Sequence, residues 1–273
     1  MHAHLPIIQF LTGLLCGFLI GLLAWRAGAL SRSGAWAATL TGGLVFGLGG
    51  LAWALLLLAF FVSSSGLSRA FARRKAELGE KFSKGSQRDW GQVLANGGLG
   101  ALLAVAHALF PEAAWPWVAF AGAMAAVNAD TWATELGVLN PTPPRLVTNG
   151  KPVARGTSGG VSLWGSLAAL GGAGLVAACA VIAGGGAPVW AVLLAAVTLG
   201  GVGGAFFDSW LGATVQAIYF CPTCQKETER HPQHTCGSRT SQMRGWRWLD
   251  NDLVNFLASL AGGVLAVAIW LLL

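Results

Sequence analysis

Long apolar runs recur along the whole chain, and they constrain its fold more than any other feature. A helix needs roughly 20 apolar residues to cross a bilayer, and most of the runs reach that length. Only 10% of the residues are charged, whereas a soluble domain carries about a quarter. The sequence therefore predicts an all-α, polytopic integral membrane protein, a single membrane domain over residues 1–273 with about seven transmembrane helices. The expected spans are Leu5–Trp25, Ala35–Val62, Val93–Phe110, Trp115–Val127 with an extension toward Glu135, Val161–Ala183, Val189–Tyr219 and Leu253–Leu273.

Three of these runs carry additional expectations. The first is expected to be a retained anchor, because Met1–His4 contains no Lys or Arg of the kind that opens a signal peptide. Ala35–Val62 is longer than a straight crossing, so it is expected to tilt or break near Gly42-Gly43 or Gly49-Gly50. It is counted as one span, which gives seven crossings, with six or eight as the alternatives. Val189–Tyr219 is also long, and we expect it to cross and then continue beyond Gly203 as an interfacial helix.

Basic residues set the expected orientation. The segment 63–92 carries seven Lys and Arg against three acids, so the positive-inside rule places it in the cytoplasm as an amphipathic segment. Counting outward puts the N-terminus inside and the C-terminus outside. The same count puts the turn around Lys151 and the Cys-rich segment inside, with Arg26 and Arg32 outside as the one departure from the rule. We expect a cytoplasmic-membrane protein whose site faces the cytoplasm and which has no nucleic-acid partner.

Acidic residues stand directly beside three of the apolar runs. Asp130 and Glu135 follow the run that ends at Val127, Asp208 follows the run that begins at Val189, and Asp252 opens the last one. An ionised acid beside hydrocarbon is costly unless it is paired or holds a metal. Three such positions in one chain indicate a polar site where helices converge, which suggests an enzyme.

Helical spacing separates the possible roles of these acids. Asp130 and Glu135 are about 140° apart on a helix, so one metal ion is not expected to bind both. We predict that Asp130 is a ligand and that Glu135 is a second ligand or a hydrogen-bond partner. Oxygen ligands of this kind suit Mg²⁺. Helix capping explains the acids near residue 250 equally well. The predicted Mg²⁺ ligands are Asp130, Asp208, Asp252 and Asn255.

A basic turn rich in glycine and hydroxyl groups precedes the fifth run, over residues 150–160. Free N–H groups at the start of a helix favour anions, and Lys151 and Arg155 add positive charge. The turn is not a Walker A sequence. Together with the acids it predicts an anion pocket opposite a metal ion.

Cysteines in the last loop have the spacing of zinc ligands. Cys221 and Cys224 form a CxxC pair, and Cys236 follows with two histidines nearby. We predict a structural Zn²⁺ site of Cys221, Cys224, Cys236 and one histidine, His231 or His234, with His234 preferred, within a small cytoplasmic loop at 221–248. Gly13, Gly17 and Gly21 form a flat helix face for packing within the chain or, less favoured, in a homodimer.

The motifs SSSGLSR, an Asn-Gly-Gly pair, NADTWATELG, GTSGGVS, GGVGGAFFDSWLGATVQ and WLDNDLVN, taken in order, resemble the membrane family that includes plant phytyl-phosphate kinase. That family is distantly similar to CTP-dependent polyprenol kinases and to CTP:phosphatidate cytidylyltransferase. The Ser-Pro-Lys-Thr turn of those enzymes is absent here, where Arg155 opens Arg-Gly-Thr-Ser, so the phosphate-binding cation is Lys151 or Arg155. Within these motifs the expected cofactor-binding residues are Arg69, Asn96, Asn128, Thr131, Thr157, Ser158 and Gly159.

The resemblance implies a Mg²⁺-dependent kinase that transfers phosphate from CTP, or another nucleoside triphosphate, to a membrane isoprenoid monophosphate. The residues expected to act in catalysis are Asp130, Glu135, Lys151, Arg155 and Asp208. Glu135 would serve as a base if the acceptor were an alcohol. A lipid-phosphate cytidylyltransferase, a prenol kinase and an anionic-lipid transporter or flippase are the alternatives.

Overall fold

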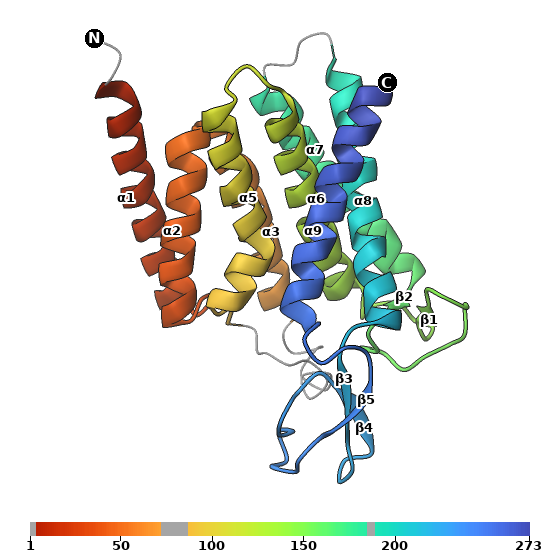
Figure 1. Ribbon diagram of the computed structural model, residues 1–273. Coiled ribbons are helices and arrows are strands. Elements are labelled where there is room, and N and C mark those ends of the chain that lie inside the picture. Colours follow the sequence, from red (N-terminus) through yellow and green to blue (C-terminus); the bar gives the residue numbers. More distant parts are fainter. Residues whose placement is uncertain (1–3, 72–86, 185–188) are drawn as a thin grey trace.

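The chain forms a bundle of helices with small β-structures at one end (Figure 1). The computed structural model describes residues 4–71, 87–184 and 189–273. This part contains eight helices, six of which are long and apolar enough to cross a membrane. The predicted all-α membrane fold is therefore confirmed. The helices are α1 (His4–Arg26), α2 (Arg32–Gly49), α3 (Leu51–Ala70), α5 (Trp90–Leu109), α6 (Trp115–Gly137), α7 (Leu163–Ala183), α8 (Trp190–Thr214) and α9 (Asn251–Leu272).

Gly50 divides the run that we counted as one span, at one of the two glycine pairs where a tilt or break was expected. Gly50 adopts φ +80°, ψ −165°, a conformation that is strained for any residue with a Cβ, and it separates α2 from α3. The chain reverses direction there, so residues 35–62 make two passes through the bundle (Figure 1). The count of seven passes is not confirmed for this reason.

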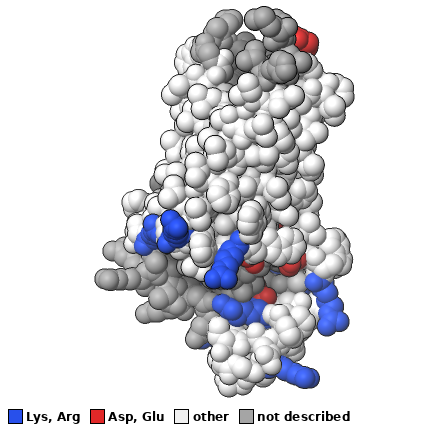
Figure 2. All heavy atoms as spheres, turned by 90° about the vertical axis from the view of Figure 1, so that its left-hand side faces the viewer, with Lys and Arg blue, Asp and Glu red and all other residues white. Residues whose placement is uncertain are grey.

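The reversal at Gly50 changes the expected topology. Both the N-terminal end of α1 and the C-terminal end of α9 lie at one end of the bundle, and the connections 27–31, 138–162 and 215–250 lie at the other, which we call the loop end (Figure 1). Arg88 links the first of these connections to the start of α5, because its N–H donates to Ala29 O at 3.1 Å and its carbonyl accepts from Ser31 N at 3.0 Å. The prediction that Arg26 and Arg32 lie opposite the other basic segments is wrong. Figure 2 shows the visible Lys and Arg side chains gathered toward the loop end.

The small-residue face of α1 packs against α2. A Cβ added at Gly13 would lie 2.7 Å from Gly47 N, and one at Gly17 would lie 2.8 Å from Thr39 O. Backbones this close leave no room for side chains, which is the usual reason for small residues between membrane helices. The glycine face is used within the chain, as the favoured interpretation predicted.

Helix α6 lies at the centre and contacts α3, α5, α7, α8 and α9. It extends to Gly137, so the expected continuation past Val127 is confirmed. Helices α6 and α8 run in the same direction and meet where added Cβ atoms at Gly201 and Gly204 would lie 2.6 Å from Ala125 and 2.5 Å from Ala126. The antiparallel α9 meets both helices through Gly262.

Short strands occupy two of the connections at the loop end, and the sequence reading did not predict them. Arg145–Leu146 (β1) pairs with Gly160–Val161 (β2). Three antiparallel strands in the order β4-β3-β5 follow α8: Ile218–Cys221 (β3), Lys226–Thr228 (β4) and Ser241–Arg244 (β5). Helix α8 continues without a break through Gly203 and ends at Thr214. The expectation of an interfacial helix reaching Tyr219 is therefore wrong.

Candidate functional site

The packing of α6 on α8 brings two acids together at the loop end. Asp130 follows Ala126 by one helical turn, and Asp208 follows Gly204 by one turn. Because these helices run in the same direction, the contact between Ala126 and Gly204 sets the two carboxylates side by side. They are close enough to interact electrostatically. The acids are 78 positions apart in sequence, and only the helix register joins them.

A third carboxylate, Glu229, interacts electrostatically with Asp208 from the loop after β4. Its position is fixed from the membrane domain by Gln216, which is 1% exposed. Gln216 Nε2 donates to Glu229 Oε1 at 3.0 Å and lies 3.5 Å from Asn251 Oδ1, while its Oε1 accepts from Ser158 Oγ at 2.6 Å. The sequence reading assigned no role to either residue: Gln216 ends the motif GGVGGAFFDSWLGATVQ, in which only Asp208 was given a role, and Glu229 lies outside the quoted motifs.

The environment of Asp208 is unusual for an acid on a membrane helix. Its Oδ2 atom is buried and has no hydrogen-bond partner among the described residues. A buried charged oxygen without a partner is costly, and two further carboxylates close by increase that cost. A cation beside Asp208 would remove the cost, so the donor set fits a hard divalent ion.

Asn128, two residues before Asp130, belongs to a fully bonded polar cluster. Its Oδ1 accepts from Ser63 Oγ at 3.0 Å and from Ser64 Oγ at 3.1 Å, and its Nδ2 donates to Gly172 O at 2.8 Å. Trp132 Nε1 donates to Ser63 Oγ at 3.2 Å. These bonds join α3, α6 and α7 in the interior, so the geometry gives Asn128 a packing role.

Glu135 lies on a different face of α6 from Asp130, as the helical spacing predicted. Its Oε1 accepts from Ser68 Oγ at 2.7 Å, and it interacts electrostatically with Arg88. Burial lowers the pKa of Arg88 to about 10, and the charge of Glu135 opposes that shift, so the guanidinium stays protonated at neutral pH. Arg88 also lies over the ring of Phe60 at 5.1 Å, and its buried Nη1 has no hydrogen-bond partner in the parts of the chain that are described.

The start of α9 shows that helix capping accounts for one acid. Asp250 is the N-cap, and its Oδ1 accepts from Leu253 N at 3.0 Å. Asp252 and Asn255 lie in the first turns of α9 and are partly buried. The Ala258 carbonyl of α9 faces Gly204 of α8. Asn255 precedes Ala258 by about one turn, and Asp208 follows Gly204 by one turn. Because the two helices are antiparallel, Asn255 and Asp208 lie at the same level of the bundle.

The turn 150–160 is tied to its surroundings mainly through backbone groups. Arg155 Nη2 donates to Asn140 O at 2.7 Å, and Lys151 is exposed with its N–H bonded to Asn149 Oδ1. Gly159 adopts φ +84°, and a Cβ there would lie 2.5 Å from Ala213, so the turn packs directly against the end of α8. The Thr157 carbonyl accepts from Gly160 N. The turn is therefore held beside the acids by Gly159 and Ser158.

Three other predicted binding residues lie apart from these contacts. Asn96 Nδ2 donates to Gln92 O and Thr131 Oγ1 donates to Val127 O, both within their own helices. Arg69 is exposed in the last turn of α3. The basic segment 63–92 begins as helix, since α3 extends to Ala70, and Arg73, Arg74, Lys75, Lys81 and Lys84 lie outside the described residues.

The predicted zinc ligands converge at the tip of the β3–β4 hairpin. Ligand atoms of Cys221, Cys224, His234 and Cys236 all lie within 4.8 Å of one another. Among the described residues, this is the one group of three or more Cys, His, Asp and Glu side chains that is compact enough to hold a metal ion. A hydrogen bond with His234 lowers the pKa of Cys236 to about 6, which favours the thiolate that binds metal. His231 instead stacks on Tyr219, with ring centroids 4.4 Å apart.

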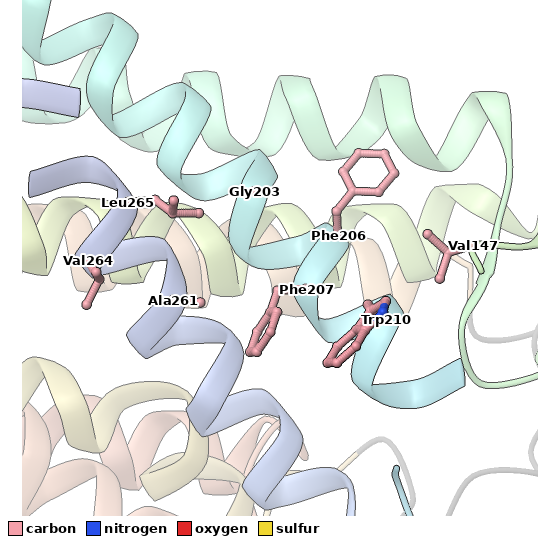
Figure 3. A pocket seen from close by; sticks show the side chains of 8 residues that line it. All are labelled: Val147, Gly203, Phe206, Phe207, Trp210, Ala261, Val264 and Leu265. Carbon is pink, nitrogen blue, oxygen red and sulfur yellow. The ribbon is translucent and has the colours of Figure 1, made fainter. Parts of the chain in front are cut away.

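An open apolar groove of about 560 Å³ runs between α8 and α9 on their outer side (Figure 3). Phe206, Phe207 and Trp210 line it from α8, and Val147 of the connection 138–162 lies at its loop end, away from Val264 and Leu265. Phe207 and Trp210 stack at 5.8 Å between centroids. The groove thus leads along the membrane helices to the basic turn.

The bundle, its apolar outer surface and its polar loop end define a polytopic helical membrane protein. The chain belongs to the family described as integral membrane protein DUF92, which matches residues 15–263. It is 32% identical to Protein PGR of Arabidopsis thaliana, covering 93% of this chain and 94% of that protein. It is 26% identical to an uncharacterised membrane protein of Methanocaldococcus jannaschii, covering 97% and 95% of the two chains. A third relative, an uncharacterised membrane protein of Synechocystis, is 30% identical over 81% of this chain and 78% of its own length. No solved structure matches the chain.

Proposed function

We propose that this protein is a CTP-dependent kinase that phosphorylates a membrane isoprenoid monophosphate to the diphosphate. The observation that carries the proposal is the meeting of Asp130 and Asp208 at the loop end, where Asp208 Oδ2 is buried without a hydrogen-bond partner in the described chain. Paired carboxylates at the end of membrane helices suit a divalent cation that binds a soluble nucleotide. The family resemblance of the motifs supplies the reaction class.

Asp130 and Asp208 would hold Mg²⁺, with Asp252 and Asn255 at the same level of the bundle as further oxygen ligands. When bound, the ion neutralises charge on the donor phosphates. In the reaction, an oxygen of the acceptor phosphate forms a bond to the γ-phosphorus, the bond from that phosphorus to the β–γ bridging oxygen breaks, and CDP leaves. A phosphate acceptor is already ionised at neutral pH, so the reaction needs no strong base.

Basic groups at the loop end would offset the phosphate charge. Lys151 is exposed and Arg88 has a buried Nη1 without a hydrogen-bond partner among the described residues, so both offer donors. Arg155 donates to the Asn140 carbonyl, which favours Lys151 over Arg155 as the cation of the turn. Cations placed where charge develops stabilise phosphoryl transfer.

The groove between α8 and α9 supports a lipid acceptor. Its walls are apolar and aromatic, and its loop end meets Val147 of the connection that also carries Lys151. A prenyl chain lying in the groove would place its phosphate near that turn while the tail stays among apolar residues. Phe206 and Trp210 are the residues expected to contact the tail.

The test is product analysis with purified protein, γ-labelled CTP or ATP, Mg²⁺, and a panel of prenols and prenyl phosphates. The expected products are a prenyl diphosphate and CDP. Release of pyrophosphate would indicate a cytidylyltransferase instead. Phosphorylation of free prenols would indicate a prenol kinase, and lipid movement without nucleotide turnover would indicate a flippase.

Asp130→Asn is expected to abolish turnover while the protein remains folded. Asp250→Asn is the matched control, because it removes an acid at the same end of the bundle and Asn still caps the helix. Equal activity in the two variants would contradict a site at Asp130.

A further inference from the structure

The β1–β2 hairpin, residues 145–161, carries one residue of the apolar groove and one cation of the basic turn. Val147 lies at the loop end of the groove between α8 and α9, and Lys151 is exposed. Backbone bonds join the two parts: Val147 N donates to Gly159 O at 3.0 Å, and Leu146 N donates to Lys151 O at 2.8 Å. Val147 and Lys151 are therefore fixed relative to each other, and whatever anchors the hairpin positions both.

Ser158 anchors the base of this hairpin to the end of α8. Its Oγ donates to Oε1 of the buried Gln216 at 2.6 Å, and its carbonyl accepts from Arg244 Nη2 at 3.4 Å. The hydroxyl has room because residue 212 is a glycine, since a Cβ there would lie 2.6 Å from Ser158 Oγ. These bonds tie the hairpin to two residues outside it.

Glu229 fixes the orientation of the Gln216 amide. A carboxylate accepts hydrogen bonds and does not donate them, and Glu229 Oε1 accepts from Gln216 Nε2 at 3.0 Å. Turning the amide over would set its oxygen against that carboxylate, and leaving a buried amide without its hydrogen bonds is costly. Glu229 therefore selects the orientation in which Gln216 accepts from Ser158.

Glu229 and Arg244 both belong to the Cys/His loop, on either side of its central strand. Glu229 directly follows β4 and Arg244 ends β5, and both strands pair with β3. Arg244 also donates through Nη1 to Gly212 O at 2.7 Å. A metal ion bound at the tip of the β3–β4 hairpin would stabilise the sheet that holds these two side chains in place. Hydrogen bonds thus connect the Cys/His loop to the hairpin that borders the groove.

We propose that Gln216 is a positioning residue through which the Cys/His loop holds the β1–β2 hairpin beside the groove. The loop then serves the lipid side of the site. It keeps Val147 at the loop end of the groove and Lys151 near the phosphate of a chain that lies there. This inference rests on the proposed function in taking the groove as the lipid site, but the positioning itself requires no catalysis.

Hydrogen–deuterium exchange of the full-length protein in detergent, without nucleotide, measures how firmly the hairpin is held. Gln216→Leu keeps the size of the side chain and removes its bonds to Ser158 and Glu229. Exchange in residues 145–161 should become about tenfold faster, while exchange in α1 and α2 stays unchanged. Gln242→Leu is the matched control, because the exposed Gln242 bonds to Gly245 O within its own loop. Equal exchange in the two variants would overturn the positioning role.

Exchanging the two bonded side chains distinguishes a direct bond from a general loss of stability. Gln216→Glu alone sets two carboxylates against each other and should make exchange in the hairpin faster. Adding Glu229→Gln should restore slow exchange, because the amide at position 229 can donate to the carboxylate at position 216, which still accepts from Ser158. Glu229→Gln alone is the reference of this cycle. A double variant that exchanges as fast as Gln216→Glu would overturn the proposed bond.

Two further measurements test the loop and the lipid separately. Cys224→Ser should make exchange faster in the β1–β2 hairpin as well as in its own loop, and a change confined to the loop would overturn the coupling. Farnesyl phosphate should slow exchange in the wild-type hairpin and have less effect in Gln216→Leu; equal protection of the two proteins would overturn the action of Gln216 on the lipid. If farnesyl phosphate gave no protection while the double variant still restored slow exchange, the groove assignment of the proposed function would fail and the bond through Gln216 would stand.

Discussion

Replacing Asp208 with Asn should make the cation-free protein more stable and inactive at the same time. In the wild type, Asp208 Oδ2 is buried without a hydrogen-bond partner in the described chain, and two carboxylates lie near it. Such a group costs about 1–3 kcal/mol, and more when charged. Substitution with Asn removes the negative charge of Asp208. The amide N–H groups of Asn can also donate hydrogen bonds to the carboxylates of Asp130 and Glu229.

The expected gain is therefore about 1–3 kcal/mol in the free energy of unfolding, or roughly 2–12 °C in Tm for a chain of this size. Divalent cations should stabilise the wild-type protein more than Asp208→Asn and so offset the higher stability of the variant. Wild-type protein should gain about 2.7 kcal/mol at a cation concentration of 100 times Kd, whereas the variant should gain little. At high cation concentration the two Tm values should approach each other or cross.

Differential scanning fluorimetry in EDTA and across a Mg²⁺ series measures both effects on one sample. Asp250→Asn is again the control, and it should show the cation-dependent rise of the wild type. A lower Tm for Asp208→Asn in EDTA would refute the claim that Asp208 is an unfavourable buried charge. An undiminished cation response in that variant would refute its role as a ligand.

Further predictions concern the packing, the zinc loop and the topology. Asn128→Ala removes three hydrogen bonds, two buried and one partly buried, worth about 0.6 kcal/mol each between membrane helices, so the free energy of unfolding should fall by roughly 2 kcal/mol. Asn96→Ala, which removes only an intrahelical bond, should change the unfolding free energy less in the same chemical denaturation series. Metal analysis should find about one Zn per chain, and Cys224→Ser should lower both the zinc content and the Tm. Arg26 is the last residue of α1, at the loop end, and Glu112 lies in the connection between α5 and α6, at the opposite end of the bundle. Cysteines introduced at these two positions should be labelled from opposite sides of sealed vesicles, and labelling of both from one side would contradict the bundle.

The sequence reading placed the two acids of α6 on different faces of the helix, because that conclusion needs only local geometry. Asp130 and Glu135 occupy different faces of one helix, and the structure shows them with different neighbours. The predicted zinc group also converged, because its ligands are close in sequence and short loops bring them together. The topology prediction failed at Gly50: a tilt or break near the paired glycines was expected, but an apolar run does not reveal that the chain reverses direction there.

Residues that depend on contacts between distant elements were beyond the sequence reading. Gln216 ends a quoted motif, but nothing in that motif indicates its role, which comes from bonds to Ser158 and Glu229 on separate connections. Arg88 was one of several equivalent basic residues in the sequence. In the structure its burial beside Glu135 distinguishes it from Arg69, which is exposed.

The sequence by itself determined the class of protein, because burying long uncharged runs in a bilayer leaves helices as the natural solution for their backbone hydrogen bonds. It also determined the Cys/His group that converges at the β3–β4 hairpin and the glycine face of α1. Only the tertiary structure decided which acids meet and on which side Arg26 lies. Those outcomes depend on the turn at Gly50 and on the register in which small residues let α6, α8 and α9 approach, and a register between helices is a property of pairs of segments rather than of either segment alone.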